Sequence, residues 1–146
     1  AQALERLQMA AFLQFMLPGM ACIYYGDEAG MQGFEDPLNR GTYPWGQEDS
    51  SLLAYFRQLG TLRKQRLSLQ CGDIGYLYAV GGGLVLRRQS EDEVTVAAMN
   101  AGMQPLELSI PWAGALAKDA LTGQHFFARN GMLRLTLPPV GGVLLV

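Results

Sequence analysis

The feature that most constrains this chain is a change in the spacing of its apolar residues near Gln70. Before that point, apolar side chains recur at helical spacing over 3–17 and 51–66. After it, they alternate with polar side chains. A repeat of 3.6 residues predicts helices, whereas a repeat of two predicts strands with one buried face. We therefore expect two parts: a helical part at 1–69 and a strand-rich part at 70–146.

The helical part contains a second type of pattern between its two helices. Pro18 and Gly19 end the first helix, and Met20–Tyr24 is a short, continuously apolar run, typical of a strand buried on both faces of a parallel sheet. A loop comes next at 25–50, far longer than the usual 2–6 residues of such a connection, and loops of this length are usually functional or disordered. Its turn signals and aromatic residues favour a packed functional loop.

The strand-rich part predicts an antiparallel β-sandwich. Apolar and polar residues alternate clearly in 106–110 and 133–137, and Gly- and Asn-rich turns separate the runs. We expect this sandwich to fold by itself, and the two helices to pack against it or against each other. The strand candidates are Ile74–Val80, Leu84–Gln89, Val94–Asn100, Leu106–Ile110, Ala115–Asp119, Gln124–Ala128, Met132–Leu137 and Gly142–Val146.

Composition excludes several classes of function. The formal net charge is −2 and the 11 Lys and Arg residues are scattered, which argues against a nucleic-acid partner. No apolar run approaches the ~20 residues that cross a bilayer, so we expect no membrane partner. The 2 cysteines and 1 histidine form no ligand cluster, so we expect no metal and no cofactor. Without a signal-peptide pattern we expect a cytoplasmic location, and Ala1 looks like a cut end.

The loop and the run before it carry a resemblance to a known family. The segment 18–31, Pro-Gly-Met-Ala-Cys-Ile-Tyr-Tyr-Gly-Asp-Glu-Ala-Gly-Met, resembles the last barrel strand and adjoining loop of α-amylase superfamily glycoside hydrolases, especially the neopullulanase, cyclomaltodextrinase and α-glucosidase types. Asp36-Pro37-Leu38-Asn39-Arg40, the aromatics of 43–45 and the helix with Arg63 are similar to the rest of that loop and to the last barrel helix of the family. The resemblance implies that 1–69 is an α-β-α remnant of a TIM barrel.

The resemblance also implies where the chemistry lies. Family members cleave α-glucosidic bonds with retention, using acidic residues on barrel strands four, five and seven. All three would precede this chain, so we expect no catalytic residue in it. Asp36 and Arg40 match a pair that contacts a glucose unit in several family members, and a carboxylate with a guanidinium suits sugar hydroxyls. The alternative is a salt bridge within the loop.

Other candidates have a structural interpretation that we favour. Asp27 and Glu28 are adjacent carboxylates at the end of a strand, pointing to opposite faces, so they suit an architectural role at the barrel rim. The loop aromatics are expected to pack within the loop. Trp112 is a core or edge anchor rather than a sugar platform, and His125 is a surface residue. The run Glu91–Glu93 is a solvated hairpin tip.

The leading hypothesis is therefore a non-catalytic C-terminal part of an α-glucan hydrolase, whose partner is an α-glucan or maltooligosaccharide in the parent enzyme. An unpaired strand at Met20–Tyr24 would favour self-association of the chain, because it offers free backbone groups and apolar side chains. One alternative is a free-standing carbohydrate-binding or structural module. Another is a small complete enzyme that uses Asp27, Glu28 and Asp36.

Overall fold

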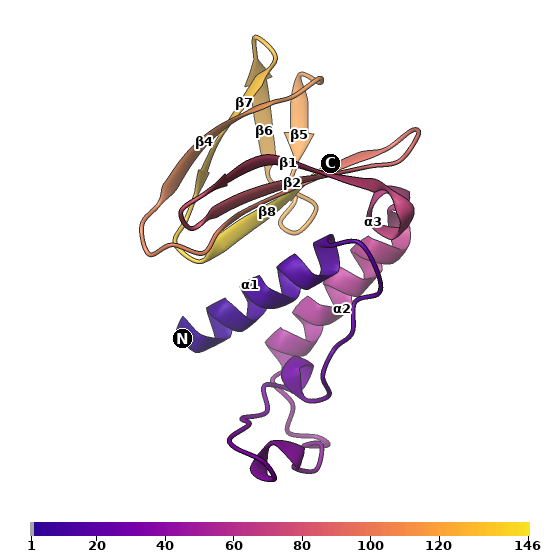
Figure 1. The fold of residues 1–146 in the computed structure, drawn as a ribbon, viewed down its shortest axis with the longest axis vertical. Helices are drawn as coiled ribbons and strands as arrows, with labels where there is room; N and C mark the ends of the chain where they lie inside the picture. Colours follow the sequence, from indigo (N-terminus) through magenta and orange to yellow (C-terminus); the bar gives the residue numbers. More distant parts are fainter. Residues whose placement is uncertain (1) are drawn as a thin grey trace.

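The computed structural model describes residues 2–146 and arranges them in three layers (Figure 1). Two long helices cover one face of a four-stranded sheet, and a second four-stranded sheet covers its other face. The elements are α1 (Gln2–Met16), η1 (Asp27–Ala29), η2 (Leu38–Arg40), α2 (Ser50–Gln65), α3 (Leu67–Cys71), β1 (Asp73–Val80), β2 (Gly83–Gln89), β3 (Val94–Asn100), β4 (Leu106–Pro111), β5 (Leu116–Lys118), β6 (His125–Arg129), β7 (Met132–Leu137) and β8 (Gly141–Leu145).

The predicted antiparallel β-sandwich is confirmed. Its sheets have the strand orders β1-β2-β3-β8 and β4-β7-β6-β5, and each neighbouring pair is antiparallel. The alternating patterns set the register of β4 against β7, where buried Leu108 lies opposite buried Leu135. Asn130 and Gly131 both have positive φ and form the tight turn between β6 and β7, which suits an Asn-Gly pair.

Two cores lie on either side of the sheet β1-β2-β3-β8. Between the two sheets, the core contains residues such as Val96, Leu133 and Leu135. On the other face, α1 contributes Phe12 and α2 contributes Leu59. This second core also contains the sheet residues Leu86, Ala97, Met99 and Leu144. The helices pack both on each other and on the sandwich, so the two parts share a core. The boundary near Gln70 falls within α3.

The predicted strand at Met20–Tyr24 is wrong for this chain. The segment has no regular secondary structure and pairs with none of the strands in residues 2–146. Its side chains face solvent, with Met20 94% and Tyr24 55% exposed. A strand requires a neighbour that accepts and donates its backbone hydrogen bonds, and the described residues provide none here. The helical part of the described chain, 2–69, therefore contains no sheet.

Two guanidinium groups bind the C-terminal end of α1. Arg63 of α2 donates to the carbonyl oxygens of Phe15, Leu17 and Gly19. Buried Arg88 of β2 donates to the carbonyl oxygens of Met16 at 2.9 Å and Gly72 at 2.7 Å.

Both cations lie where a helix has unsatisfied carbonyl groups and a partial negative charge. Burial lowers the pKa of Arg88, and the charge of Arg63 lowers it further. The backbone carbonyl oxygens at the end of α1 thus bind these two cations, a role that a carboxylate often has.

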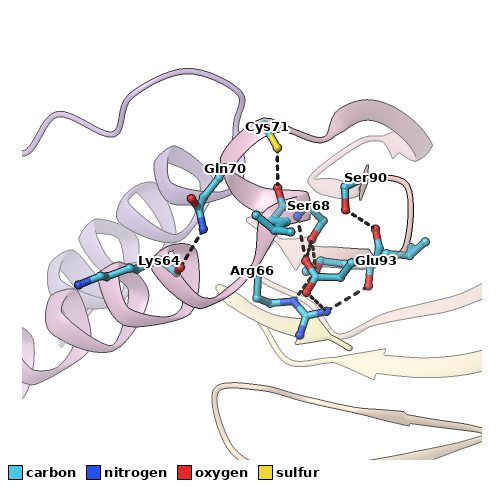
Figure 2. A network of polar contacts seen from close by, with 10 residues as sticks. Lys64, Arg66, Ser68, Gln70, Cys71, Ser90 and Glu93 are labelled. Carbon is cyan, nitrogen blue, oxygen red and sulfur yellow. Dashed lines mark hydrogen bonds and ion pairs between the residues drawn. The ribbon is translucent and has the colours of Figure 1, made fainter.

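A polar network joins the connection after α2 to the β2–β3 hairpin (Figure 2). Ser68 donates to Glu93 from its backbone N–H at 2.8 Å and from its hydroxyl at 2.5 Å. The Arg66 guanidinium lies 3.3 Å from the same carboxylate and donates to the Thr95 hydroxyl at 2.7 Å. Glu93 is therefore bound on several sides, and the expectation of a solvated tip is wrong for this residue.

Candidate functional site

The long loop between α1 and α2 is fixed at its base by η1. Ala29 is buried, and its carbonyl oxygen accepts from the backbone N–H of Asp49 at 3.0 Å. Asp49 in turn caps α2, accepting from the N–H groups of Ser51 and Leu52 at 3.0 Å each. Gly26 has a φ of 97°, and a Cβ there would clash with the side chain of Met31. This turn thus requires glycine.

Asp27 and Glu28 lie in η1, at the base of the loop. The Glu28 carboxylate accepts from the backbone N–H of Gly26 at 2.9 Å, which fits an architectural role. Burial raises the pKa of Asp27, and the neighbouring charge of Glu28 raises it further. Desolvation, followed by the charge of Glu28, also raises the pKa of Tyr43. The charge of Glu28 thus raises the pKa of both Asp27 and Tyr43 at the base of the loop.

Asp36 and Arg40 lie together at the tip of the loop. The Nε atom of Arg40 is 2.8 Å from a carboxylate oxygen of Asp36, and the side chains of Arg40 and Asp36 are 69% and 61% exposed, respectively. The Asp36–Pro37 peptide bond is cis, and Arg40 N–H donates to the carbonyl of Pro37 at 3.0 Å. An ion pair this exposed stabilises the fold by only about 0–1 kcal/mol. Both side chains remain accessible to a ligand, and a sugar-contacting role stays a prediction.

The aromatic residues of the loop divide into two groups. The Tyr25 hydroxyl donates to the carbonyl of Gly41 at 3.0 Å and so ties two parts of the loop together. Tyr43 packs against Trp45 with ring centroids 4.6 Å apart, yet Trp45 is 82% exposed. Phe34 is 69% exposed. The expectation of packing within the loop therefore holds for Tyr25 and Tyr43, whereas Phe34 and much of Trp45 face solvent.

The remaining candidates, Trp112 and His125, lie in the sandwich. The indole N–H of Trp112 donates to the carbonyl of Leu116 at 3.0 Å, and its ring packs against the core between the sheets, as expected of an anchor. His125 is an exposed residue at the start of β6.

Sequence reasoning missed Phe127, which is 74% exposed. The signal was the adjacent pair Phe126-Phe127 in a predicted strand, because neighbouring side chains in a strand point to opposite faces.

Residues 2–146 contain neither a metal-binding cluster nor a membrane-spanning helix. No three His, Cys, Asp or Glu side chains gather closely enough there to hold a metal ion. Within the same residues, no helix has the length and apolar character needed to cross a membrane.

The chain is similar to proteins that act on α-glucans. Residues 83–144 match the family model for the maltogenic amylase C-terminal domain. The chain is 34% identical to an amylopullulanase of Thermoanaerobacter thermohydrosulfuricus, covering 99% of this chain and 11% of the relative. It is 33% identical to a cyclomaltodextrinase of Geobacillus thermopakistaniensis, covering 96% of this chain and 25% of the relative.

A solved structure extends the similarity to three dimensions. The α-amylase from Geobacillus thermoleovorans, in complex with acarbose, has a TM-score of 0.90 and 27% identity over 97% of this chain and 33% of that chain. The helices, the loop and the sandwich all fall inside this overlap. The chain therefore spans about a third of that structure, and only 11% and 25% of the two curated relatives.

Proposed function

Since this chain belongs to the α-amylase family of glycoside hydrolases, we propose that it is the non-catalytic C-terminal part of an enzyme that cleaves α-glucosidic bonds in starch-like glucans or maltooligosaccharides. The observation that carries this proposal is the similarity over 97–99% of the chain, which includes the helical part and the loop as well as the sandwich. A free-standing sandwich module would explain similarity at 83–144 alone, so this alternative is not favoured.

Retaining cleavage of such bonds needs two carboxyl groups ~5–5.5 Å apart on either side of the scissile bond. In the described residues, Asp27 and Glu28 are neighbours in η1, and Glu28 is held by the backbone of Gly26. Neither faces the other across a cavity. We propose that the catalytic carboxylates lie outside this chain and that the chain alone is inactive.

In the proposed enzyme, Asp36 and Arg40 bind a glucose unit of the substrate. A carboxylate accepts hydrogen bonds from two neighbouring hydroxyl groups, and a guanidinium donates from a rigid planar fork. The ion pair at the loop tip holds both groups in place while leaving them more than half exposed. Phe34 and Trp45 offer exposed aromatic faces on the same loop.

The first test is hydrolysis by the longest natural polypeptide that contains this segment, compared with the 146-residue chain. Starch, pullulan and cyclodextrin serve as substrates. We expect the longer protein to release reducing sugar and the short chain to release none. If the short chain shows turnover, and Asp27→Asn or Glu28→Gln abolishes it, the chain is a small complete enzyme instead.

A second test concerns the loop tip in the longer protein. Asp36→Asn and Arg40→Gln are expected to raise KM for maltooligosaccharides on the order of tenfold each, because each removes a charge-assisted hydrogen bond of about 1.5–3 kcal/mol. The matched control is Glu35→Gln, since the Glu35 side chain forms no ion pair within residues 2–146. Equal KM values for all three variants would reduce the pair to a loop-internal salt bridge.

A further inference from the structure

The outer face of the sheet β4-β7-β6-β5 carries an exposed aromatic ring. Phe126 and Ala128 of β6 pack against the core between the sheets, so Phe127 points to the opposite, solvent side and is 74% exposed. Single exposed apolar side chains are common on protein surfaces. What gives Phe127 significance is therefore the set of side chains around it.

The strand register places Phe127 in a row that crosses the sheet. Leu116 of β5 lies opposite Phe127, and Ser109 of β4 lies opposite Arg134 of β7. The pairs Ala128–Leu133 and Arg129–Met132 fix β6 against β7. Extending this register by one residue brings Phe127 to Arg134, and the two side chains line the same groove. An apolar side chain, an aromatic ring, a guanidinium and a hydroxyl thus succeed one another on a single face.

A groove of about 510 Å³ lies over this part of the sheet. Its lining residues are Ser109, Phe127, Arg129, Asn130, Met132 and Arg134. The volume falls within the range of small-ligand sites. The ion pairs found within residues 2–146 use Arg40 and Arg66, so the guanidinium groups of Arg129 and Arg134 keep their donors available.

The chemistry of this lining fits a sugar. The apolar face of a pyranose packs on an aromatic ring, while guanidinium, amide and hydroxyl groups bind its hydroxyls. We propose that the outer face of β4, β7 and β6, centred on Phe127, is a second, non-catalytic binding site for an α-glucan chain. This inference rests on the proposed function for the identity of the glucan, and it goes beyond that function in assigning a site.

The position of this site separates it from the candidate loop. In Figure 1, β6 and β7 lie at one end of the molecule and the loop that contains η2 lies at the other. One glucan unit therefore cannot contact Phe127 and Asp36 together. The second site instead holds a polymeric substrate at the surface, which raises the local substrate concentration for the enzyme as a whole.

The test is a titration of the nitrogen-labelled 146-residue chain with maltoheptaose, monitored by amide chemical shifts. We expect saturable shifts at Phe127, Arg129 and Arg134. The variant Phe127→Ala is expected to weaken binding at these amides by about two- to tenfold, because aromatic stacking is worth roughly 0.5–1.5 kcal/mol. Arg134→Met weakens it as well. Both side chains are exposed, so we expect neither substitution to unfold the chain. The amide spectrum of each variant checks that it is folded.

Tyr76→Ala is the matched control, since Tyr76 is an aromatic residue on β1 that is 65% exposed but lies on the other sheet. Unchanged shifts with maltoheptaose, or the same affinity in Phe127→Ala as in Tyr76→Ala, overturn the proposal. So does a response to inorganic phosphate alone. Sugar-independent dimerisation that Phe127→Ala abolishes would also overturn it, by making this face an interface between copies.

The proposed function is tested separately by hydrolysis in the longer protein. If that protein cleaves starch while the labelled chain shows shifts only in the loop 25–49, the second site is wrong and the proposed function stands. If Phe127 responds to maltoheptaose but the longer protein cleaves no glucan, the binding site stands and the enzymatic proposal is wrong.

Discussion

Glu93 shows how much a single side chain depends on contacts distant in sequence. Its carboxylate accepts two hydrogen bonds from Ser68, which lies 25 residues earlier, and it pairs with Arg66 (Figure 2). Burial by itself would raise the pKa of Glu93, but the bonds from Ser68 and the charge of Arg66 outweigh it and hold the pKa below its usual 4.5. The ionised carboxylate therefore stabilises the folded state.

We expect Glu93→Gln to lower the free energy of unfolding by about 1–2 kcal/mol at pH 7, because it removes a charge-assisted contact. The folded pKa is depressed, so this contribution is complete above pH 4.5 and is lost as pH falls below it. Urea unfolding at about pH 7 and about pH 3 should show a difference from wild type that shrinks in acid. Glu91→Gln is the control, and an equal effect of both variants would contradict the prediction.

Arg88 permits a second test at the scale of one residue. Arg88→Met removes the donors of the buried Met16 carbonyl group and the partly buried Gly72 carbonyl group, and a buried group left unsatisfied costs about 1–3 kcal/mol. Thermal unfolding should therefore shift downward by several degrees. Arg87→Met is the matched control, because Arg87 is the neighbour in β2 that faces solvent. A shift of the same size in both would show that the contacts to α1 contribute nothing.

The sequence could predict local features of individual residues but not these pairings. Asp49 as a helix cap and Asn130-Gly131 as a tight turn result from short-range chemistry, and the structure contains both. The role of Glu93 depends on a partner 25 residues away. The run of three carboxylates at 91–93 does not reveal that partner. From the sequence alone, only the general tendency of such a run to be solvated could be predicted.

At the scale of elements, the two types of periodicity predicted most of the fold. The helix at 51–66 is found at Ser50–Gln65, and all eight strand candidates of the sandwich are present with no end shifted by more than one residue. The segment Met20–Tyr24 failed because an apolar run specifies a buried strand only when neighbours exist to pair with it. The salt bridge between Asp36 and Arg40, one of the two interpretations of that pair, is found. Whether they contact sugar stays a prediction.

This unpaired segment should cause self-association of the 146-residue chain. Met20, Ile23 and Tyr24 expose apolar surface on a segment that pairs with no strand in residues 2–146, a combination that favours pairing with another chain. Sedimentation velocity should therefore detect dimers or larger species at micromolar concentration. Ile23→Lys should shift the distribution toward the monomer, since a charge opposes edge pairing.

Val80→Lys is the control for that experiment, because Val80 is an equally apolar residue that is 64% exposed on β1. A wild-type chain that is strictly monomeric would contradict the prediction. An equal response to both variants would point to general solubility rather than to this segment.

At the scale of the whole molecule, the helices and the sandwich share a core and so depend on each other. Leu86, Met99 and Leu144 of the sheet β1-β2-β3-β8 are buried beneath α1 and α2. The expectation that the helices pack against the sandwich or against each other is confirmed, because they do both. That the sandwich folds by itself stays a prediction, and this shared core argues against it. The alternation in β2, β3 and β8 is weak, and their continuous apolar runs at 84–86, 96–99 and 143–145 could have indicated cover on both sides.

We therefore expect residues 70–146, expressed without the helices, to be much less stable than the full chain. Uncovering Leu86, Met99 and Leu144 forfeits about 1.5–3 kcal/mol for each side chain. Circular dichroism should show a lower unfolding temperature, and an apolar dye should bind the shortened form but not the full chain. Equal unfolding temperatures would show that the helices only rest on the sandwich.

The doubly covered sheet limits how enzymes of this family can be recombined. A chimera joined near Gln70 would place one parent's helices on another parent's sheet, and the contact between Phe12 and its sheet neighbours would then be mismatched in volume. A junction upstream of α1 transfers the helices, the loop and the sandwich as one block and leaves this contact intact. Exchange of the helices, loop and sandwich between parents should therefore succeed more often at that upstream junction than at the point where the chain changes from helix to strand.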